Sequence, residues 1–251
     1  MKLYGLIGYP LSHSFSKGYF TDKFEKDSIS DSIYENFTIE SIDEIINIIK
    51  SNSELIGLNV TIPYKEQVIQ FLNETDDAVK EIGAVNTIKI KRENNKIYLK
   101  GYNTDVYGFE NSLKPLFEDY DYKALILGTG GASKAIKYIL KQLYINYISA
   151  SIEELKENEI RYNEIDKNMI MDRLLIINAT PLGTYPNVDA CPDIPYESIT
   201  EKHILFDLVY NPAETLFLSH GKKRGAKVKN GLEMLHLQAE KSYEIWNNPN
   251  L

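Results

Sequence analysis

Lys65 and Asp105 are the residues of this chain whose types best suit proton transfer. Lys65 follows the apolar run 55–62 and Pro63, and the end of a buried strand is where α/β proteins present side chains to ligands. A lysine can donate a proton to a ketone oxygen, especially when burial lowers its pKa. Asp105 could bind a substrate hydroxyl and hold the ammonium group in place. The alternatives are a solvated surface lysine and an acid that favours the first turn of a helix.

Ser14 and Ser16 stand in a turn after the apolar run 3–9. Their hydroxyls and the nearby backbone N–H groups could bind a carboxylate. Serine is common in any turn, so a purely structural turn is the alternative. His13 lies beside them, and we expect a structural histidine because no Ser/Asp triad partner is evident. No spacing of His, Cys, Asp and Glu in the chain suggests a metal site.

The segment Gly128-Thr129-Gly130-Gly131-Ala132-Ser133 is a glycine turn between an apolar run, 124–127, and a helical pattern, 134–143. Gly128 would permit a tight turn, and Gly130 would let the backbone approach a pyrophosphate at the start of the helix. Gly131 and Ala132 continue this surface. The third glycine of the usual dinucleotide pattern is Ser133 here, so the match is partial. A tight turn without a ligand is the alternative.

The strand after this turn should set the choice between NAD and NADP. An acid about 20 residues after the glycines binds a ribose hydroxyl, and an arginine binds a 2′-phosphate. Here the segment 148–151 has neither, and offers the hydroxyls of Ser149 and Ser151. We expect NADP to be used, with NAD as an alternative and with weaker discrimination than an arginine would give. An arginine at Ala150 should then improve the use of NADP.

The composition is that of a soluble globular protein of one large or two modest domains. The chain has 251 residues, 43% of them apolar, and a net charge of −8, which argues against nucleic acid as a partner. Cys191 is the single cysteine, which excludes an intrachain disulfide and fits a reducing compartment. No stretch approaches the roughly 18 apolar residues of a membrane span. We therefore expect a cytoplasmic protein without a membrane partner, as a monomer or a homodimer.

Hydrophobic periodicity predicts an α/β protein. Ser41 and Glu44 have the spacing of a capping box before a helix at 41–51, and a second helix should begin at Pro63. Asn94-Asn95 separates two strands of a hairpin. The strand–helix pattern then restarts as a Rossmann-type unit with strands at 124–127, 146–149, 174–178 and 204–209, and 151–172 is weakly patterned. We divide the chain into a mixed α/β domain at 1–105, a Rossmann-type domain at 106–229, and a final helix at 230–251 that returns to the first domain.

Five short motifs, in order along the chain, resemble the shikimate dehydrogenase family. They are residues 8–16, 59–66, 83–87, 101–105 and 127–133. The resemblance implies a substrate domain, a Rossmann-type NADP domain, and interconversion of 3-dehydroshikimate and shikimate. It makes Lys65 the acid–base residue and Asp105 its partner. Carboxylate binding falls to Ser14 and Ser16.

Further site residues follow from the resemblance alone. Thr61, Asn86 and Gln238 are implied to bind substrate hydroxyls, and Tyr210 to lie near the carboxylate. Thr180 and Gly231 are implied to lie on the cofactor side. Lys17 departs from the family, since most members have proline there. Other readings are a quinate or quinate/shikimate dehydrogenase, a catalytically silent metabolite-binding protein, and a folate-linked dehydrogenase, for which no matching substrate motif is present.

Overall fold

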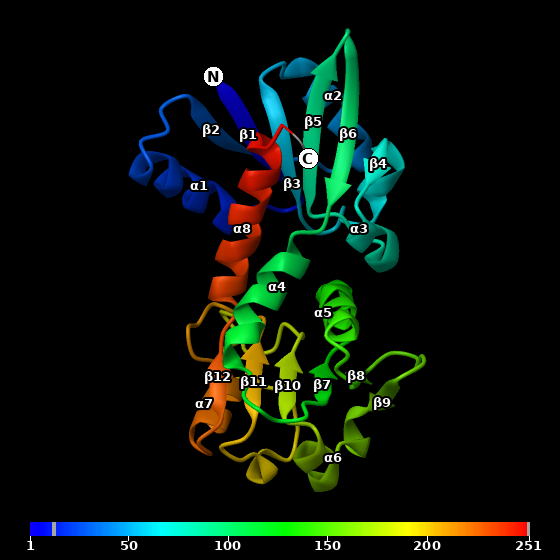
Figure 1. Ribbon diagram of the computed structural model, residues 1–251, viewed down its shortest axis with the longest axis vertical. Coiled ribbons are helices and arrows are strands. Elements are labelled where there is room, and N and C mark those ends of the chain that lie inside the picture. Colours follow the sequence, from blue (N-terminus) through cyan, green and yellow to red (C-terminus); the bar gives the residue numbers. More distant parts are fainter. Residues whose placement is uncertain (12–13, 250–251) are drawn as a thin grey trace. The chain divides into compact units, whose positions relative to one another are not determined.

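The computed structural model describes residues 1–11 and 14–249 of the protein (Figure 1). The chain forms two compact units. The first unit comprises Met1–Thr104 and Gln238–Leu251, and the second unit comprises Asp105–Leu237. The chain thus leaves the first unit after residue 104 and returns at residue 238. The sequence placed these divisions after residues 105 and 229.

The first unit is built on a mixed sheet in the order β2-β1-β3-β5-β6-β4. β1, β2 and β3 are parallel, whereas β5 runs antiparallel to β3 and β6. Its elements are β1 (Lys2–Gly8), α1 (Phe15–Lys26), β2 (Ser32–Thr38), α2 (Ile45–Ser51), β3 (Leu55–Val60), β4 (Glu74–Thr75), α3 (Asp77–Ile82), β5 (Thr87–Glu93) and β6 (Lys96–Tyr102). Helix α8 (Leu232–Asn247) contributes its C-terminal part.

Each face of this sheet carries its own apolar core, because side chains alternate along a strand. On β1, Leu3 and Ile7 pack with α2 and α3 on one face. Tyr4 and Leu6 point to the other face, where they pack with α1 and with Trp246 of α8. The return of the last helix to the first unit therefore rests on a buried aromatic cluster.

The second unit is a parallel sheet in the order β12-β11-β10-β7-β8-β9, which Figure 1 shows from one edge to the other. Helices α4 and α5 share one core with this sheet, and α6 and α7 share the other. The elements are α4 (Asp105–Leu113), β7 (Ala124–Leu127), α5 (Gly131–Gln142), β8 (Tyr147–Ser151), β9 (Glu159–Arg161), α6 (Lys167–Asp172), β10 (Leu175–Asn178), β11 (Ile204–Asp207), α7 (Leu216–Lys222) and β12 (Lys227–Lys229). The predicted fold class, a mixed α/β domain with a Rossmann-type domain, is confirmed.

Two local predictions are confirmed and one is wrong. Ser41 and Glu44 form both bonds of the capping box, before a 3-10 turn that leads into α2. The hairpin turns at Asn94-Asn95, which adopt positive φ values of 51° and 60°. No α-helix begins at Pro63 among the described residues; the chain instead makes a turn and then a 3-10 helix, Gln67–Phe71. The carbonyl of Lys65 accepts the N–H of Val85 at 2.7 Å, and the N–H of Ile69, its partner in an α-helix, donates to Glu66 instead.

Within residues 1–11 and 14–249, no helix has the length and apolar character needed to cross a membrane.

Candidate active site

The topology of the first sheet brings several predicted site residues to one edge, by which we mean the side of the sheet where the carboxyl ends of β1 and β3 lie. β1 and β3 are parallel, so the turns that follow them, with Ser14 and Thr61, leave from the same edge. β5 runs antiparallel to β3, so it begins at that edge, just after Asn86. β6 runs antiparallel to β5, so it ends there, before Thr104. Lys65, five residues after β3, belongs to the same edge.

Backbone hydrogen bonds fix the segments of this edge to one another. The N–H of Thr61 donates to the carbonyl of Ile7 at 3.0 Å, which joins the ends of β3 and β1. The carbonyl of Lys65 accepts from Val85, and the side-chain oxygen of Asn86 accepts the N–H of Thr104 at 2.7 Å. Lys65 is half-buried and Asn86 is buried. Lys65 therefore lies in a turn that is fixed by backbone hydrogen bonds, and not on the surface of a helix.

Ser14 and Ser16 lie at the start of α1, where they have different surroundings. Ser14 is the N-cap residue of α1, but its side chain makes no capping hydrogen bond. Its Oγ is buried and has no hydrogen-bond partner among the described residues. Ser16 lies in the first turn of α1 and is half-buried. A buried hydroxyl at the first turn of a helix suits an anionic ligand, because the dipole and the hydroxyl act together. His13 lies outside the described residues.

The predicted acid–base partner, Asp105, is the first residue of α4 and follows Thr104 directly in the chain. It is half-buried, as is expected of an acid in the first turn of a helix. Gln238 is buried on α8, with 8% of its surface exposed, and Tyr210 is 38% exposed in the loop after β11.

The glycine turn of the second unit has the form that a phosphate group needs. Gly128 has a φ of +102°, which only glycine adopts readily. A Cβ atom at Gly130 or Gly131 would meet nothing within 4 Å, so the backbone there borders open space. Gly130 is the N-cap of α5 and provides no side chain to bind the first N–H groups. Ser133 is buried and donates to the carbonyl of Gly130 at 2.7 Å.

A cavity of about 580 Å³ opens beside this turn, within the size range of small-molecule sites. Gly128, Thr129 and Gly130 form one side of it. The other lining residues follow β8, β9 and β10: Ile152, Glu153, Tyr162, Ala179, Thr180, Pro181, Leu182, Cys191, Pro192 and Asp193. A nucleotide bound with its phosphates at the start of α5 fits this cavity.

The end of β8 differs from its prediction in two respects. Ser149 is fully buried, and no described residue partners its Oγ, so it does not line the cavity. Ser151 is also buried, but its Oγ bonds Thr129 of the glycine turn at 3.1 Å and accepts the N–H of Glu153. Ala150 is fully buried in the core that the sheet shares with α6 and α7. It is therefore the wrong position for an arginine that should reach a ligand. Ile152, which is 87% exposed, is the position that lines the cavity.

Strand β9 places a cation beside this loop. Arg161 pairs in register with Ser151 of β8, and its guanidinium donates to the carbonyl of Glu153. The weakly patterned segment 151–172 thus contains a strand and a helix, and its arginine could not be connected with the end of β8 from the sequence.

Thr180 is held by a buried polar chain. Both its N–H and its hydroxyl donate to the side-chain oxygen of Asn178, at 3.0 and 2.6 Å. The amide of Asn178 donates in turn to Asp207 at 2.9 Å. Burial raises the pKa of Asp207 to about 6 although Thr215, Val209 and Asn178 all donate to its carboxylate. These hydrogen bonds fix the loop after β10, which lines the cavity.

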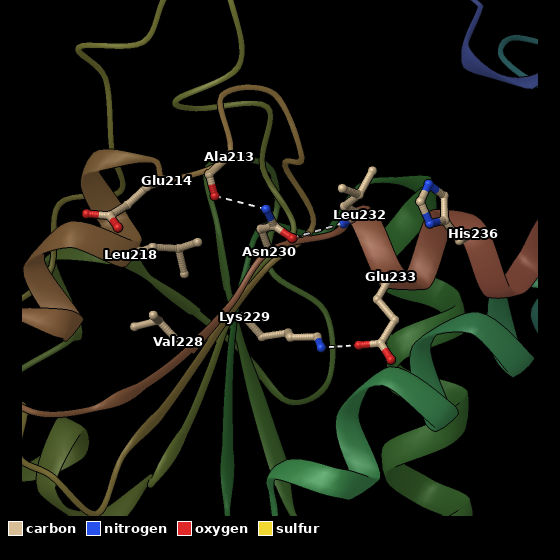
Figure 2. Close-up of a pocket in the computed structure, with 9 residues that line it drawn as sticks. All are labelled: Ala213, Glu214, Leu218, Val228, Lys229, Asn230, Leu232, Glu233 and His236. Atoms are coloured by element: carbon tan, nitrogen blue, oxygen red, sulfur yellow. Dashed lines mark hydrogen bonds and ion pairs between the residues drawn. The ribbon is translucent and has the colours of Figure 1, made fainter. Parts of the chain in front are cut away.

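Gly231 lies in the turn that precedes α8, where a Cβ atom would stand 2.2 Å from the carbonyl oxygen of Leu208. Close backbone packing therefore explains this glycine. A second cavity of about 410 Å³ borders the turn (Figure 2). The amide of Asn230 donates to the carbonyl of Ala213 there, and Lys229 pairs with Glu233. Because these polar groups stabilise the loop itself, we assign no ligand to this second cavity.

The sequence reasoning missed one group of residues altogether. Asn59 is buried in β3 and bonds Tyr34, Thr87 and Ser242. Its signal in the sequence was an amide inside the apolar run 55–62, where an unpaired polar group would be costly. Among the described residues, no cluster of three or more His, Cys, Asp and Glu side chains could hold a metal ion.

Comparison with known proteins gives a consistent result. Residues 6–88 match the family model described as the shikimate dehydrogenase substrate binding domain. The chain is 38% identical to the shikimate dehydrogenase (NADP(+)) of Methanococcus aeolicus, over 98% of this chain and 91% of that one. It is 41% identical to the corresponding protein of Clostridium beijerinckii, over 98% and 92%. The crystal structure of shikimate 5-dehydrogenase from Thermus thermophilus in complex with NADP(H) and shikimate superposes with a TM-score of 0.82 at 27% identity, and covers 98% of this chain and 94% of that one.

Proposed function

Because this chain belongs to the shikimate dehydrogenase family, we propose that it catalyses the reversible NADPH-dependent reduction of 3-dehydroshikimate to shikimate. It is then an oxidoreductase that acts on a secondary alcohol in aromatic amino-acid biosynthesis. The observation that carries the proposal is the single sheet edge from which the segments with Ser14, Thr61, Lys65 and Asn86 leave. The cavity beside the glycine turn supports it independently.

In this proposal the first unit binds the substrate and the second unit binds the cofactor. Bound NADPH supplies the hydride. Lys65 donates the proton that the ketone oxygen needs, and takes it back in the reverse direction. Asp105, its proposed partner, binds a substrate hydroxyl.

The remaining groups hold and orient the substrate. Ser14 and Ser16 bind its carboxylate, with Tyr210 near this end. Thr61, Asn86 and Gln238 bind its ring hydroxyls. Several directional hydrogen bonds to the ring fix the position of the carbon that exchanges the hydride. This orientation lowers the barrier to the reaction.

The cofactor groups follow from the geometry of the second unit. Gly128, Gly130, Gly131 and Ala132 would receive the pyrophosphate at the start of α5. Ser151, which is hydrogen-bonded to Thr129 of the glycine turn, would lie near the adenosine ribose, and Thr180 would contact the nicotinamide side. Ser149 is left out, because it is fully buried. A cytoplasmic location belongs to the same proposal and is supported by the single cysteine.

A steady-state assay tests this function. Purified protein should reduce NADP with shikimate, followed by the near-ultraviolet absorbance of the reduced nicotinamide. Shikimate and quinate should each be tried with NADP and with NAD. Turnover of quinate in preference to shikimate would favour a quinate dehydrogenase, and no turnover with any of the four pairs would refute the proposal.

A further inference from the structure

The segment that follows β10, residues 179–183, forms one side of the cavity in the second unit, and we call it the β10 loop. β7 stands between β8 and β10 in the sheet (Figure 1). In a Rossmann-type unit the adenosine ribose lies at the end of the second strand, which is β8 here. A cofactor with its phosphates at the start of α5 therefore directs its nicotinamide half towards the β10 loop.

The glycine turn packs closely against the β10 loop. A Cβ atom at Gly128 would stand 2.9 Å from Cγ2 of Thr180 and 3.3 Å from the backbone carbonyl of Ala179. Carbon atoms in contact are about 3.5–4.0 Å apart, so even a methyl group does not fit between the two segments. A shift of the β10 loop would therefore change the shape of the cavity beside the glycine turn.

Asn178, the last residue of β10, holds the β10 loop in shape with its side chain. Its Oδ1 atom accepts the backbone N–H of Thr180 at 3.0 Å and the hydroxyl of Thr180 at 2.6 Å. Its Nδ2 atom donates to the carbonyl of Leu182 at 3.4 Å. A backbone N–H can only donate and a carbonyl can only accept, so the orientation of this amide is fixed. The hydroxyl of Thr180 in turn accepts the N–H of Leu182 at 3.2 Å.

Asp207, the last residue of β11, anchors Asn178. The two residues are in register across the parallel strands, and both are fully buried. Oδ1 of Asp207 accepts from Nδ2 of Asn178 at 2.9 Å and from the N–H of Val209 at 3.0 Å. Its Oδ2 accepts the hydroxyl of Thr215, the N-cap residue of α7. One carboxylate oxygen thus holds the residue that shapes the β10 loop, and the other holds the start of α7.

We propose that Asp207 is a positioning residue of the cofactor site, which fixes the β10 loop through Asn178 before the nicotinamide half of NADP binds. This inference rests on the proposed function, since it takes NADP to be the occupant of the cavity. Asp207 is not among the residues that line the cavity, and it acts through Asn178. Because the loop is ordered in advance, less conformational freedom is lost when the cofactor binds.

The same geometry sets the chemical role of Thr180. Its proton is donated to Asn178, and one lone pair of its oxygen accepts the N–H of Leu182. A hydroxyl oxygen has two lone pairs, so Thr180 can accept one further hydrogen bond but has no proton to donate. It therefore suits a hydroxyl of the nicotinamide ribose.

The test compares two probes on the same variants. NADP carries both halves of the cofactor, and adenosine 2′,5′-bisphosphate carries the adenosine half alone. Asp207→Ala removes the acceptor of Asn178, so it should raise the Kd of NADP by about 2- to 10-fold, the scale of one hydrogen bond, and leave the Kd of the bisphosphate unchanged. Asp207→Asn should restore the Kd of NADP, because its carbonyl oxygen can accept from Asn178 while its amide faces the oxygen of Thr215.

Thr215→Val is the matched control. Thr215 is buried and bonds the same carboxylate, but through the oxygen that faces α7. This variant should lower the free energy of unfolding and leave the Kd of both probes unchanged. An equal loss of NADP affinity in Asp207→Ala and Thr215→Val, or an equal loss of both probes in Asp207→Ala, would make Asp207 a structural residue and overturn the inference. A failure of Asp207→Asn to restore binding would overturn it as well.

Hydrogen exchange in the unaltered protein gives an independent measurement. Without cofactor, the backbone N–H groups of Thr180 and Leu182 should exchange at least about tenfold more slowly than unprotected amides, because side-chain oxygens accept both of them. Rapid exchange of both would overturn the inference even where Asp207→Ala does not fold. Turnover of shikimate by the parent tests the proposed function separately, so an active parent in which Asp207→Ala binds both probes normally rejects this inference alone.

Discussion

Gly57 of β3 is the position where a single methyl group should do the most damage to the first unit. A Cβ atom there would stand 2.2 Å from Cδ1 and 2.4 Å from Cγ of Trp246. Carbon atoms in contact are about 3.5–4.0 Å apart, so Gly57→Ala must displace the indole by more than about 1 Å. That ring packs on Tyr4 and Phe20, with centroids 5.1 and 5.6 Å away, and its N–H donates to the carbonyl of Ile88 at 3.0 Å.

Two contributions set the size of the effect. Overpacking of a tight core costs about 1–3 kcal/mol, and loss of a buried hydrogen bond about 1–3 kcal/mol. We therefore expect Gly57→Ala to lower the free energy of unfolding by about 2–6 kcal/mol, a large part of the roughly 5–15 kcal/mol of a typical domain. Because Gln238 lies on the same helix as Trp246, the KM for shikimate should rise as well.

Urea unfolding followed by fluorescence measures this directly, since Trp246 is the single tryptophan of the chain. Gly18→Ala is the matched control. Gly18 lies within α1, and a Cβ atom there meets nothing within 4 Å, so the same substitution should stabilise by about 0.5–1 kcal/mol. If Gly57→Ala changed the free energy of unfolding by less than about 0.5 kcal/mol, the packing argument would be wrong.

Four further changes test the two ligand sites and the core. Lys65→Ala should lower kcat by about 10²–10⁴-fold with a smaller change in KM, and a change confined to KM would make Lys65 a binding residue. Ser14→Ala should weaken shikimate binding by about 1–3 kcal/mol in calorimetry because its hydroxyl is buried, whereas an equal loss of NADP affinity would indicate a folding defect. Ile152→Arg should raise kcat/KM for NADP above that for NAD by about 1–3 kcal/mol at fixed salt, and equal effects on both cofactors would place the 2′-phosphate elsewhere. Burial raises the pKa of Asp207 from 3.8 to about 6, so its contribution to stability is present at low pH and lost as pH rises through 6. The free energy of unfolding of the parent minus that of Asp207→Asn should therefore fall by about 3 kcal/mol between about pH 4 and pH 7, and a flat difference would contradict the raised pKa.

Local signals in the sequence were reliable where a few neighbouring residues determine the structure. The capping box of Ser41 and Glu44 and the Asn94-Asn95 turn need only contacts within a few residues, and both formed as expected. The helix expected at Pro63 failed for a non-local reason. Val85 donates to the carbonyl of Lys65, and this bond depends on the pairing of strands that are far apart in the chain.

The same distinction separates the site residues that the sequence could identify from those that it could not. Residues in turns, such as Ser14 and Lys65, stand out because they follow strands, where ligands bind in α/β folds. Asn59 does not stand out in this way, since its role depends on partners in β2, β5 and α8. Burial is equally non-local, which is why Ser149 resembled a ligand group in the sequence and is a core residue in the structure.

The segment 148–151 at the end of β8 contains no arginine. The crossover that follows it adds β9, which lies parallel to β8 and brings Arg161 to the carbonyl of Glu153. Glu153 lines the cavity, and Arg161 contacts its backbone carbonyl without being among the residues that line the cavity. Because an acid lines the cavity at this point and segment 148–151 contains no arginine, we expect NADP to be accepted with modest discrimination, and an exposed arginine at position 152 to increase it.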